Sequence, residues 1–243
     1  MQPSKANSPV DTVASPSTAA LERVAARRLF AAGEVATIEA VAAEVPVALV
    51  YNGISHVVMM ATPEDLGDFA LGFSLSEGIL RRPAEMGAIE IVETSSGIEA
   101  RLEIDRRRAA MLDIRRRNLA GRTGCGICGV DSLEAALRPL PRLKSSAAPS
   151  VDAVRRALAA LPAAQPINSE THSVHAAAFA DLDGRVGLLR EDVGRHNALD
   201  KLIGAMANAG ADPAGGFAVI TSRCSMEMVQ KAVTIGISTL VAI

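Results

Sequence analysis

The alternation of apolar and polar positions predicts two strand pairs in the first half of the chain. Residues 47–50 and 54–60 have strand-like patterns and flank Asn52-Gly53, a dipeptide typical of a type I′ hairpin turn. A second pair is predicted at 89–92 and 98–104, joined by a Ser-Ser-Gly turn. These patterns indicate antiparallel hairpins rather than isolated strands.

A helix is predicted between the two hairpins. Thr62 is expected to be its N-cap, Pro63 suits the first helical position, and Gly78 is expected to end it. The apolar positions that recur at helical spacing are Leu66, Phe69, Ala70 and Phe73. The first half of the chain therefore combines helix and strand.

The second half has the pattern of an α/β domain. Ser150 is expected to cap a helix over 151–161. Strands are predicted at 176–180, 185–189, 217–220 and 237–243, and helices at 196–207 and 226–233. A strand, a helix and a strand at the spacing of 217–243 predict a parallel pair with a right-handed crossover.

These segments suggest four parts. Residues 1–20 are rich in Ser, Pro, Thr and Ala and are expected to be a disordered leader. Residues 21–139 form a smaller N-terminal α+β domain that ends in a cysteine-containing loop. The Pro- and Ser-rich residues 140–150 are expected to be a linker, and 151–243 to be the α/β domain.

Composition excludes several classes of function. The 243 residues include 25 basic and 27 acidic residues, five Phe, one Tyr and no Trp, which argues against a nucleic-acid-binding protein. The most apolar stretch, 232–243, is shorter than the roughly 20 residues that a membrane-spanning helix needs. Three cysteines are too few for a disulfide scaffold. We therefore expect a cytoplasmic protein with reduced thiols, bound neither to membrane nor to nucleic acid.

The loop GRTGCGICG at 121–129 carries the most specific chemistry. Cys125 and Cys128 allow four interpretations: a structural turn, half of a zinc site, a thioredoxin-like redox pair, or a nucleophilic or sulfur-carrying thiolate. Zinc needs two further ligands, and the chain has no second C-x-x-C pair and no H-x₃₋₅-H pair, so no metal is expected. The H-x-E pattern of zinc deaminases is also absent.

The surroundings of this loop favour a reactive thiolate. Residues 101–122 contain eight arginines against three acidic residues, and a capping-box pattern at 131–134 predicts a helix start. Positive charge and a helix N-terminus both lower the pKa of a thiol, and glycines allow a bulky partner to approach the sulfur. The arginine run alone is also compatible with a solvated helix face.

Two further segments place polar residues where a strand ends and a helix begins. REDVGRHNALDK at 190–201 is suited to an anion at a helix N-terminus, although a solvated, capped helix start has the same pattern, and His196 fits either. In TSRCSME at 221–227, Ser and Arg side chains could hold a phosphate, or Ser222 or Ser225 could simply cap a helix. Cys224 is expected to be a small buried residue.

A third segment places His172 and His175 at the start of a strand, where a hydrogen-bonded structural histidine is the ordinary interpretation. Two histidines this close together also allow a functional role.

Four motifs together resemble one family. GRTGCGICG at 121–129, REDVGRHNALDKLIG at 190–204, SRCSMEMVQK at 222–231 and LGFSLSEG at 71–78 are similar to the FdhD family of formate dehydrogenase accessory proteins. The resemblance implies a sulfurtransferase that acts as a sulfur carrier. A cysteine desulfurase would load a persulfide on Cys125, with Cys128 assisting. The sulfur would then pass to the molybdenum cofactor, bis-molybdopterin guanine dinucleotide, before its insertion into the formate dehydrogenase catalytic subunit.

The resemblance also implies a fold and an assembly. The expected fold is a cytidine deaminase-like α/β sandwich without the zinc site, and the expected assembly is a homodimer. The family pattern continues beyond Ile243, so we expect this chain to lack the family's C-terminal end. The expected cofactor-binding residues are Arg122, Thr123, His175, Asp192, Arg195, His196, Asn197 and Arg223. The alternative function is a non-catalytic chaperone that binds the guanine-containing cofactor.

Overall fold

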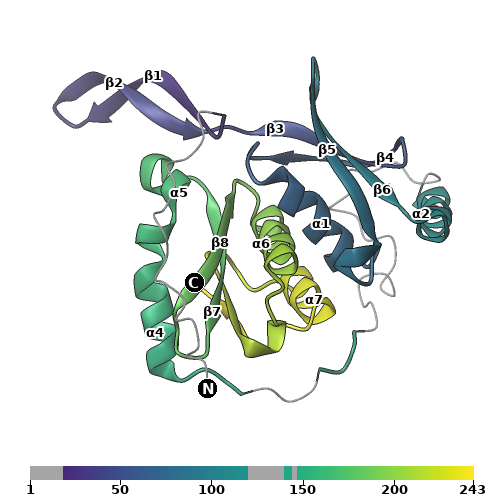
Figure 1. The fold of residues 1–243 in the computed structure, drawn as a ribbon. Coiled ribbons are helices and arrows are strands. Elements are labelled where there is room, and N and C mark those ends of the chain that lie inside the picture. Colours follow the sequence, from purple (N-terminus) through teal and green to yellow (C-terminus); the bar gives the residue numbers. More distant parts are fainter. Residues whose placement is uncertain (1–18, 120–139, 144–146) are drawn as a thin grey trace, which may run out of the picture.

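The computed structural model describes residues 19–119, 140–143 and 147–243, and no side chain in 113–119. Its first sheet has the order β4-β3-β6-β5 (Figure 1). The four strands are β3 (Val45–Tyr51), β4 (Ile54–Ala61), β5 (Met86–Thr94) and β6 (Gly97–Ile104). Both predicted hairpins are confirmed, and the Asn52-Gly53 turn has the two positive φ angles, 48° and 80°, that a type I′ turn requires.

Helix α1 (Leu66–Ser76) follows this first hairpin. The prediction that Thr62 caps it is wrong: the N-cap is Asp65, and the Thr62 hydroxyl instead accepts a hydrogen bond from the backbone N–H of Val193 at 3.2 Å. The Thr62 hydroxyl is therefore bonded to a residue distant in sequence and is not used to cap α1. The predicted end is confirmed, because the C-cap Glu77 is followed by Gly78 with φ 66°.

The second sheet has the order β10-β9-β7-β8. Its strands are β7 (His175–Asp181), β8 (Val186–Asp192), β9 (Gly216–Ile220) and β10 (Leu240–Ala242). The predicted parallel pair is confirmed as β9 with β10, although β10 is shorter than the predicted strand at 237–243. The mixed α/β class is confirmed as well, whereas the finer likeness to cytidine deaminase stays a prediction.

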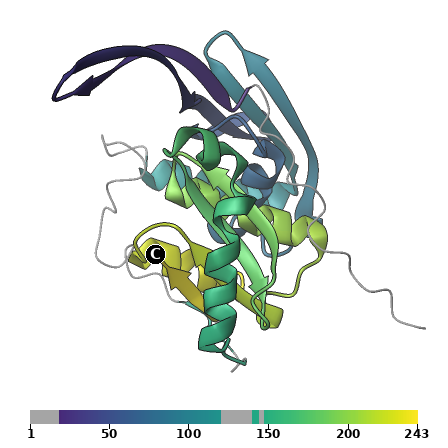
Figure 2. The same ribbon diagram turned by 90° about the vertical axis from the view of Figure 1, so that its left-hand side faces the viewer.

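Helices cover both faces of this sheet (Figure 2). Alternate residues of β9 separate the two cores: Val219 joins the cluster with α4, and Ala218 joins the cluster with α6. The helices are α4 (Val151–Ala160), α5 (Pro166–Thr171), α6 (Arg195–Ala209) and α7 (Met226–Thr234). The Ser150 cap of α4 is confirmed, since its hydroxyl accepts from the backbone N–H of Ala153 at 3.1 Å.

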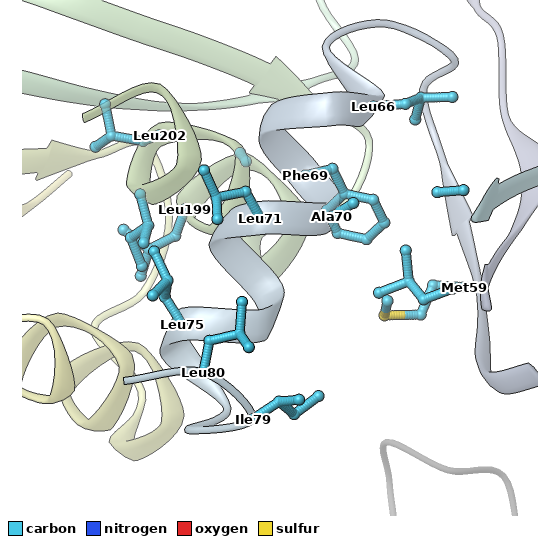
Figure 3. Close-up of a cluster of buried hydrophobic side chains, with 14 of the residues drawn as sticks. Met59, Leu66, Phe69, Ala70, Leu71, Leu75, Ile79, Leu80, Leu199 and Leu202 are labelled. Carbon is cyan, nitrogen blue, oxygen red and sulfur yellow. The ribbon is translucent and has the colours of Figure 1, made fainter. Parts of the chain in front are cut away.

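Helices α1 and α6 pack directly against each other between the two sheets. In Figure 3, Phe69 of α1 points toward Met59 of β4, while Leu71 points toward Leu199 of α6. The two backbones touch at glycine, because a Cβ added to Gly72 would lie 1.7 Å from the carbonyl oxygen of Asp200. The largest hydrophobic cluster therefore includes residues on both sides of the segment 140–150.

The two four-stranded sheets and the helices packed on them form what we call the body. An antiparallel hairpin, which we call the arm, extends away from it (Figures 1 and 2). It consists of β1 (Leu21–Phe30) and β2 (Gly33–Ala42), and no sequence pattern had predicted it. Its root packs against Ile167, Val174 and Val193, whereas Leu29 and Phe30 near its tip are 78% and 60% exposed. The arm is attached to the body only at its base within the described chain.

The remaining elements connect these parts. They are α2 (Arg106–Leu119) and the short 3₁₀ helices Pro83–Glu85, Pro162–Ala164 and Pro213–Gly215. Most of the predicted leader lies outside the described residues, and 140–143 and 147–150 have no regular secondary structure. Within the described ranges, no helix is long and apolar enough to span a membrane.

Candidate functional site

Three of the motifs meet at one end of the second sheet. Strand β8 ends at Asp192, β9 ends at Ile220, and the antiparallel β7 begins there at His175. The register pairs His175 with Asp192 and Ala177 with Ile220. The sheet therefore brings together His175, the turn before α6 and the turn before α7. We call His175, Arg195, His196, Arg223 and Cys224 the polar rim.

His175 is fixed by a backbone contact. Its Nδ1 lies 2.8 Å from the carbonyl oxygen of Thr221, and the Thr221 hydroxyl oxygen accepts a hydrogen bond from the backbone N–H of Ala176 at 2.8 Å. Because a carbonyl can only accept, Nδ1 carries the proton and Nε2 is the acceptor in the neutral ring. The turn before α7 is thereby joined to the start of β7.

Asp192 and Asn197 lie behind the rim and are buried. Asp192 accepts hydrogen bonds from the backbone N–H groups of Thr62 and Gly194, at 3.0 and 2.7 Å, and from the Asn197 side chain at 2.9 Å. It also forms an ion pair of 2.7 Å with Lys201, and both of these side chains are fully buried. Asp192 and Asn197 thus fix the conformation of the turn before α6. They can affect a ligand only through that conformation.

Arg195 and His196 are the first two residues of α6, after Gly194, and no side chain caps this helix. Both are partly exposed. Nε2 of His196 is buried and has no hydrogen-bond partner among the described residues. Burial, helped by the charges of Arg195 and Lys231, lowers the pKa of His196, so the ring is neutral at pH 7. An uncapped helix start with a neutral imidazole and a guanidinium can receive an anion.

The turn before α7 differs from its prediction in one respect. Cys224, expected to be buried, is exposed. The reason is that β9 ends at Ile220, so Cys224 lies in a surface turn beyond the sheet. Ser225 occupies the N-cap position of α7 without a side-chain hydrogen bond, and Arg223 is exposed beside it. The simple capping interpretation of this segment is therefore not supported.

A second buried network connects α1, α6 and α7. Lys231 of α7 forms an ion pair with Asp200 of α6 at 2.9 Å and contacts Glu77 at 2.9 Å and Ser76 at 3.0 Å, both at the end of α1. Sequence reasoning did not single out these residues. A signal was present, since Asp200 and Lys201 interrupt the apolar residues of α6.

Comparison with known proteins identifies the chain. The family model described as "FdhD/NarQ family" matches residues 42–243. The chain belongs to the FdhD/NarQ family. The sequence resemblance to FdhD is thereby confirmed, and the polar rim is a feature of a member of this family.

Relatives within the family cover most of this chain. A protein named sulfur carrier protein FdhD from Xanthomonas euvesicatoria pv. vesicatoria is 57% identical over 212 residues, 87% of this chain and 75% of that protein. One with the same name from Bordetella petrii is 52% identical over 203 residues, 84% of this chain and 73% of that protein. The crystal structure of a formate dehydrogenase accessory protein from Desulfotalea psychrophila matches with a TM-score of 0.71, covering 92% of this chain and 84% of that one. At 23% identity, that last match supports the fold alone.

Four of the predicted FdhD/NarQ site residues, Arg122, Thr123, Cys125 and Cys128, lie outside the described residues. Of the other predicted site residues, His175, Arg195, His196 and Arg223 belong to the rim, and Asp192 and Asn197 lie behind it. Within the described ranges, no three His, Cys, Asp or Glu side chains are placed to hold a metal ion.

Proposed function

We propose that this chain is a sulfur carrier in the maturation of formate dehydrogenase. Its relatives of 52–57% identity are named sulfur carrier protein FdhD, and it has a C-x-x-C pair, Cys125 and Cys128, in a glycine-rich loop. The structural observation that carries the proposal is the polar rim, which sets cationic and imidazole side chains beside two helix N-termini. A thiol pair supplies the sulfur chemistry, and the rim supplies a place for an anionic acceptor.

The proposed acceptor is the molybdenum cofactor in its bis-molybdopterin guanine dinucleotide form, which would be bound as cargo. Its pyrophosphate groups are multiply charged anions. Helix N-termini attract such groups, and the forked guanidinium of an arginine such as Arg195 or Arg223 binds phosphate oxygens in pairs. The neutral His196 ring can add a hydrogen bond without changing the charge of the site.

The proposed sulfur step is a transpersulfidation at Cys125. The Cys125 thiolate attacks the outer sulfur of a persulfide on a cysteine desulfurase, a new S–S bond forms on Cys125, and the desulfurase thiolate leaves. No external oxidant is needed because the sulfane sulfur is transferred as such. Cys128 would assist its release toward the cofactor. These steps belong to the cytoplasm, and we propose that the carrier works there as a homodimer before the formate dehydrogenase catalytic subunit receives the cofactor.

The test is intact mass spectrometry after incubation with a cysteine desulfurase and cysteine. A reducible adduct of one sulfur is expected on the wild-type chain and on Cys224→Ser, a matched control because Cys224 is an exposed cysteine. Cys125→Ala is expected to lose the adduct. An adduct that persists in Cys125→Ala would contradict the assignment.

The alternative, a non-catalytic cofactor chaperone, rests on the separation of the rim from the two cysteines in sequence. It predicts that a Cys125→Ala, Cys128→Ala variant still activates formate dehydrogenase in a cell lacking the wild-type protein. Loss of that activation supports the sulfur carrier instead.

A further inference from the structure

Lys231 has an unusual environment for a lysine. Its side chain is only 7% exposed, and its ammonium donates to both carboxylate oxygens of Asp200 at 3.0 and 2.9 Å. It also donates to Glu77 and Ser76 and lies 5.3 Å from the centre of the Phe73 ring. One cation therefore joins three helices: α1 through Ser76 and Glu77, α6 through Asp200, and α7 through its own backbone.

The ion pair joins the sixth residue of one helix to the sixth residue of another. Asp200 is the sixth residue of α6, which begins at Arg195, and Lys231 is the sixth residue of α7, which begins at Met226. At 1.5 Å rise per residue, each lies about 7.5 Å from the first residue of its helix. A bond between these two positions fixes α7 relative to α6 at a point five residues after the start of each helix.

We propose that Lys231 is a positioning residue, which aligns the N-termini of α6 and α7 so that Arg195, His196 and Arg223 face one anionic ligand. This inference rests on the proposed function, because it concerns the site where the cofactor's phosphates would bind. It adds a residue behind the rim that touches no ligand and acts only through the two helices.

The charge of Lys231 is not available to a ligand. Asp200 and Glu77 both contact the ammonium, so two carboxylates already surround it. Burial opposes the charged form, but these carboxylates outweigh it and raise the pKa of Lys231, so the ion pair persists at pH 7. The contribution of Lys231 to the rim is therefore geometric rather than an attraction of its own.

Short length makes α7 dependent on this contact. The helix has nine residues, fewer than an isolated helix needs for stability in water. Its buried residues Met228 and Ala232 hold it to the core, but apolar contacts alone permit sliding and rotation. A hydrogen-bonded ammonium with fixed partners specifies one position along α6.

The experiment measures the affinity for guanosine diphosphate, a probe with the guanine and pyrophosphate groups of the proposed cargo, by isothermal titration calorimetry. Lys231→Met keeps the aliphatic stem and removes the ammonium. A double variant, Lys231→Met with Asp200→Asn, removes both charges and avoids an unpaired buried carboxylate. Both are expected to bind at least about tenfold more weakly than wild type, as for a misplaced set of charged hydrogen bonds.

The matched control is Asp68→Asn, which breaks the ion pair that α1 makes with Arg190 at its opposite end. It is expected to bind guanosine diphosphate like wild type. Persulfide formation on Cys125 is the second readout, and it is expected to be unchanged in the double variant, because alignment of the rim is not needed to load sulfur. Weaker binding with intact persulfide loading separates positioning from general damage to the fold.

Three results would overturn the inference, and they can be told apart. Equal affinity of wild type and the double variant would refute the positioning role and leave the proposed function standing. No binding of guanosine diphosphate to wild type would refute the proposed phosphate site and, with it, the role assigned to Lys231. Weak binding by Asp68→Asn equal to that of the double variant would also count against positioning.

Discussion

An ion pair in the body and one in the arm have the same N–O distance but differ in how exposed their side chains are. Lys201 and Asp192 are 2.7 Å apart with both side chains fully buried, whereas Arg28 and Glu39 are also 2.7 Å apart with side chains 63% and 32% exposed. An exposed pair is screened by water and contributes little. A buried pair costs desolvation to form, but loss of one partner leaves a charge with no water to solvate it. Distance alone does not reveal which pair the structure depends on.

Packing is also tighter in the body than in the arm. In the body, α1 and α6 approach until their backbones touch at Gly72 and Gly204, which leaves no room for change. In the arm, two strands pair only with each other in the described chain, and a lone hairpin is marginally stable in water. We therefore expect substitutions to act strongly on the body and weakly on the arm.

The largest effect is expected from Lys201→Met. It leaves the Asp192 carboxylate buried without its cation and also removes hydrogen bonds to the carbonyl oxygens of Thr62 and Glu191. The expected loss is about 3–5 kcal/mol in the free energy of unfolding, measured by urea denaturation. The added change Asp192→Asn is expected to restore part of this loss. An unchanged urea midpoint would show that the pair is solvated.

A smaller loss is expected from Gly72→Ala. The new methyl group meets the Asp200 carbonyl, so α1 and α6 must separate, at a cost of about 1–3 kcal/mol in the free energy of unfolding. Gly67→Ala is the control in the same helix, since nothing lies within 4 Å of its added Cβ. It is expected to be neutral or stabilising. Equal behaviour of the two variants in urea would contradict the close helix contact.

The smallest effect is expected in the arm, from Arg28→Met. The urea midpoint is expected to stay within measurement error because the pair is exposed. The pKa of Glu39, lowered by the hydrogen bond from Arg28, is expected to rise toward its ordinary value, which an NMR titration of the carboxyl carbon would detect. A large stability loss would mean that the arm is covered by another surface in solution.

Local patterns predicted the elements that depend on near neighbours. The Asn52-Gly53 turn, the Ser150 cap and the β9–β10 pair follow from turn chemistry, capping and crossover spacing, all of which are encoded within a few dozen residues. The prediction that Thr62 caps α1 was wrong because the backbone N–H of Val193, far along the chain, donates a hydrogen bond to the Thr62 hydroxyl. The arm was missed because no distinctive turn dipeptide marks it and its apolar residues are not arranged toward a core.

The sequence by itself determined the family, the α/β class and the segments that carry chemistry, since these are properties of motifs and spacing. Only the tertiary structure decided which polar and charged residues of these segments face solvent and which are buried. It left Arg195, His196 and Arg223 at least partly exposed and turned Asp192 and Asn197 inward. It also buried two lysines: Lys201, which ties α6 to the end of β8, and Lys231, which ties α7 to α6 and α1. The reason is physical: a charged residue has the same local pattern whether it faces water or a partner, and only the packing of elements distant in sequence removes the water.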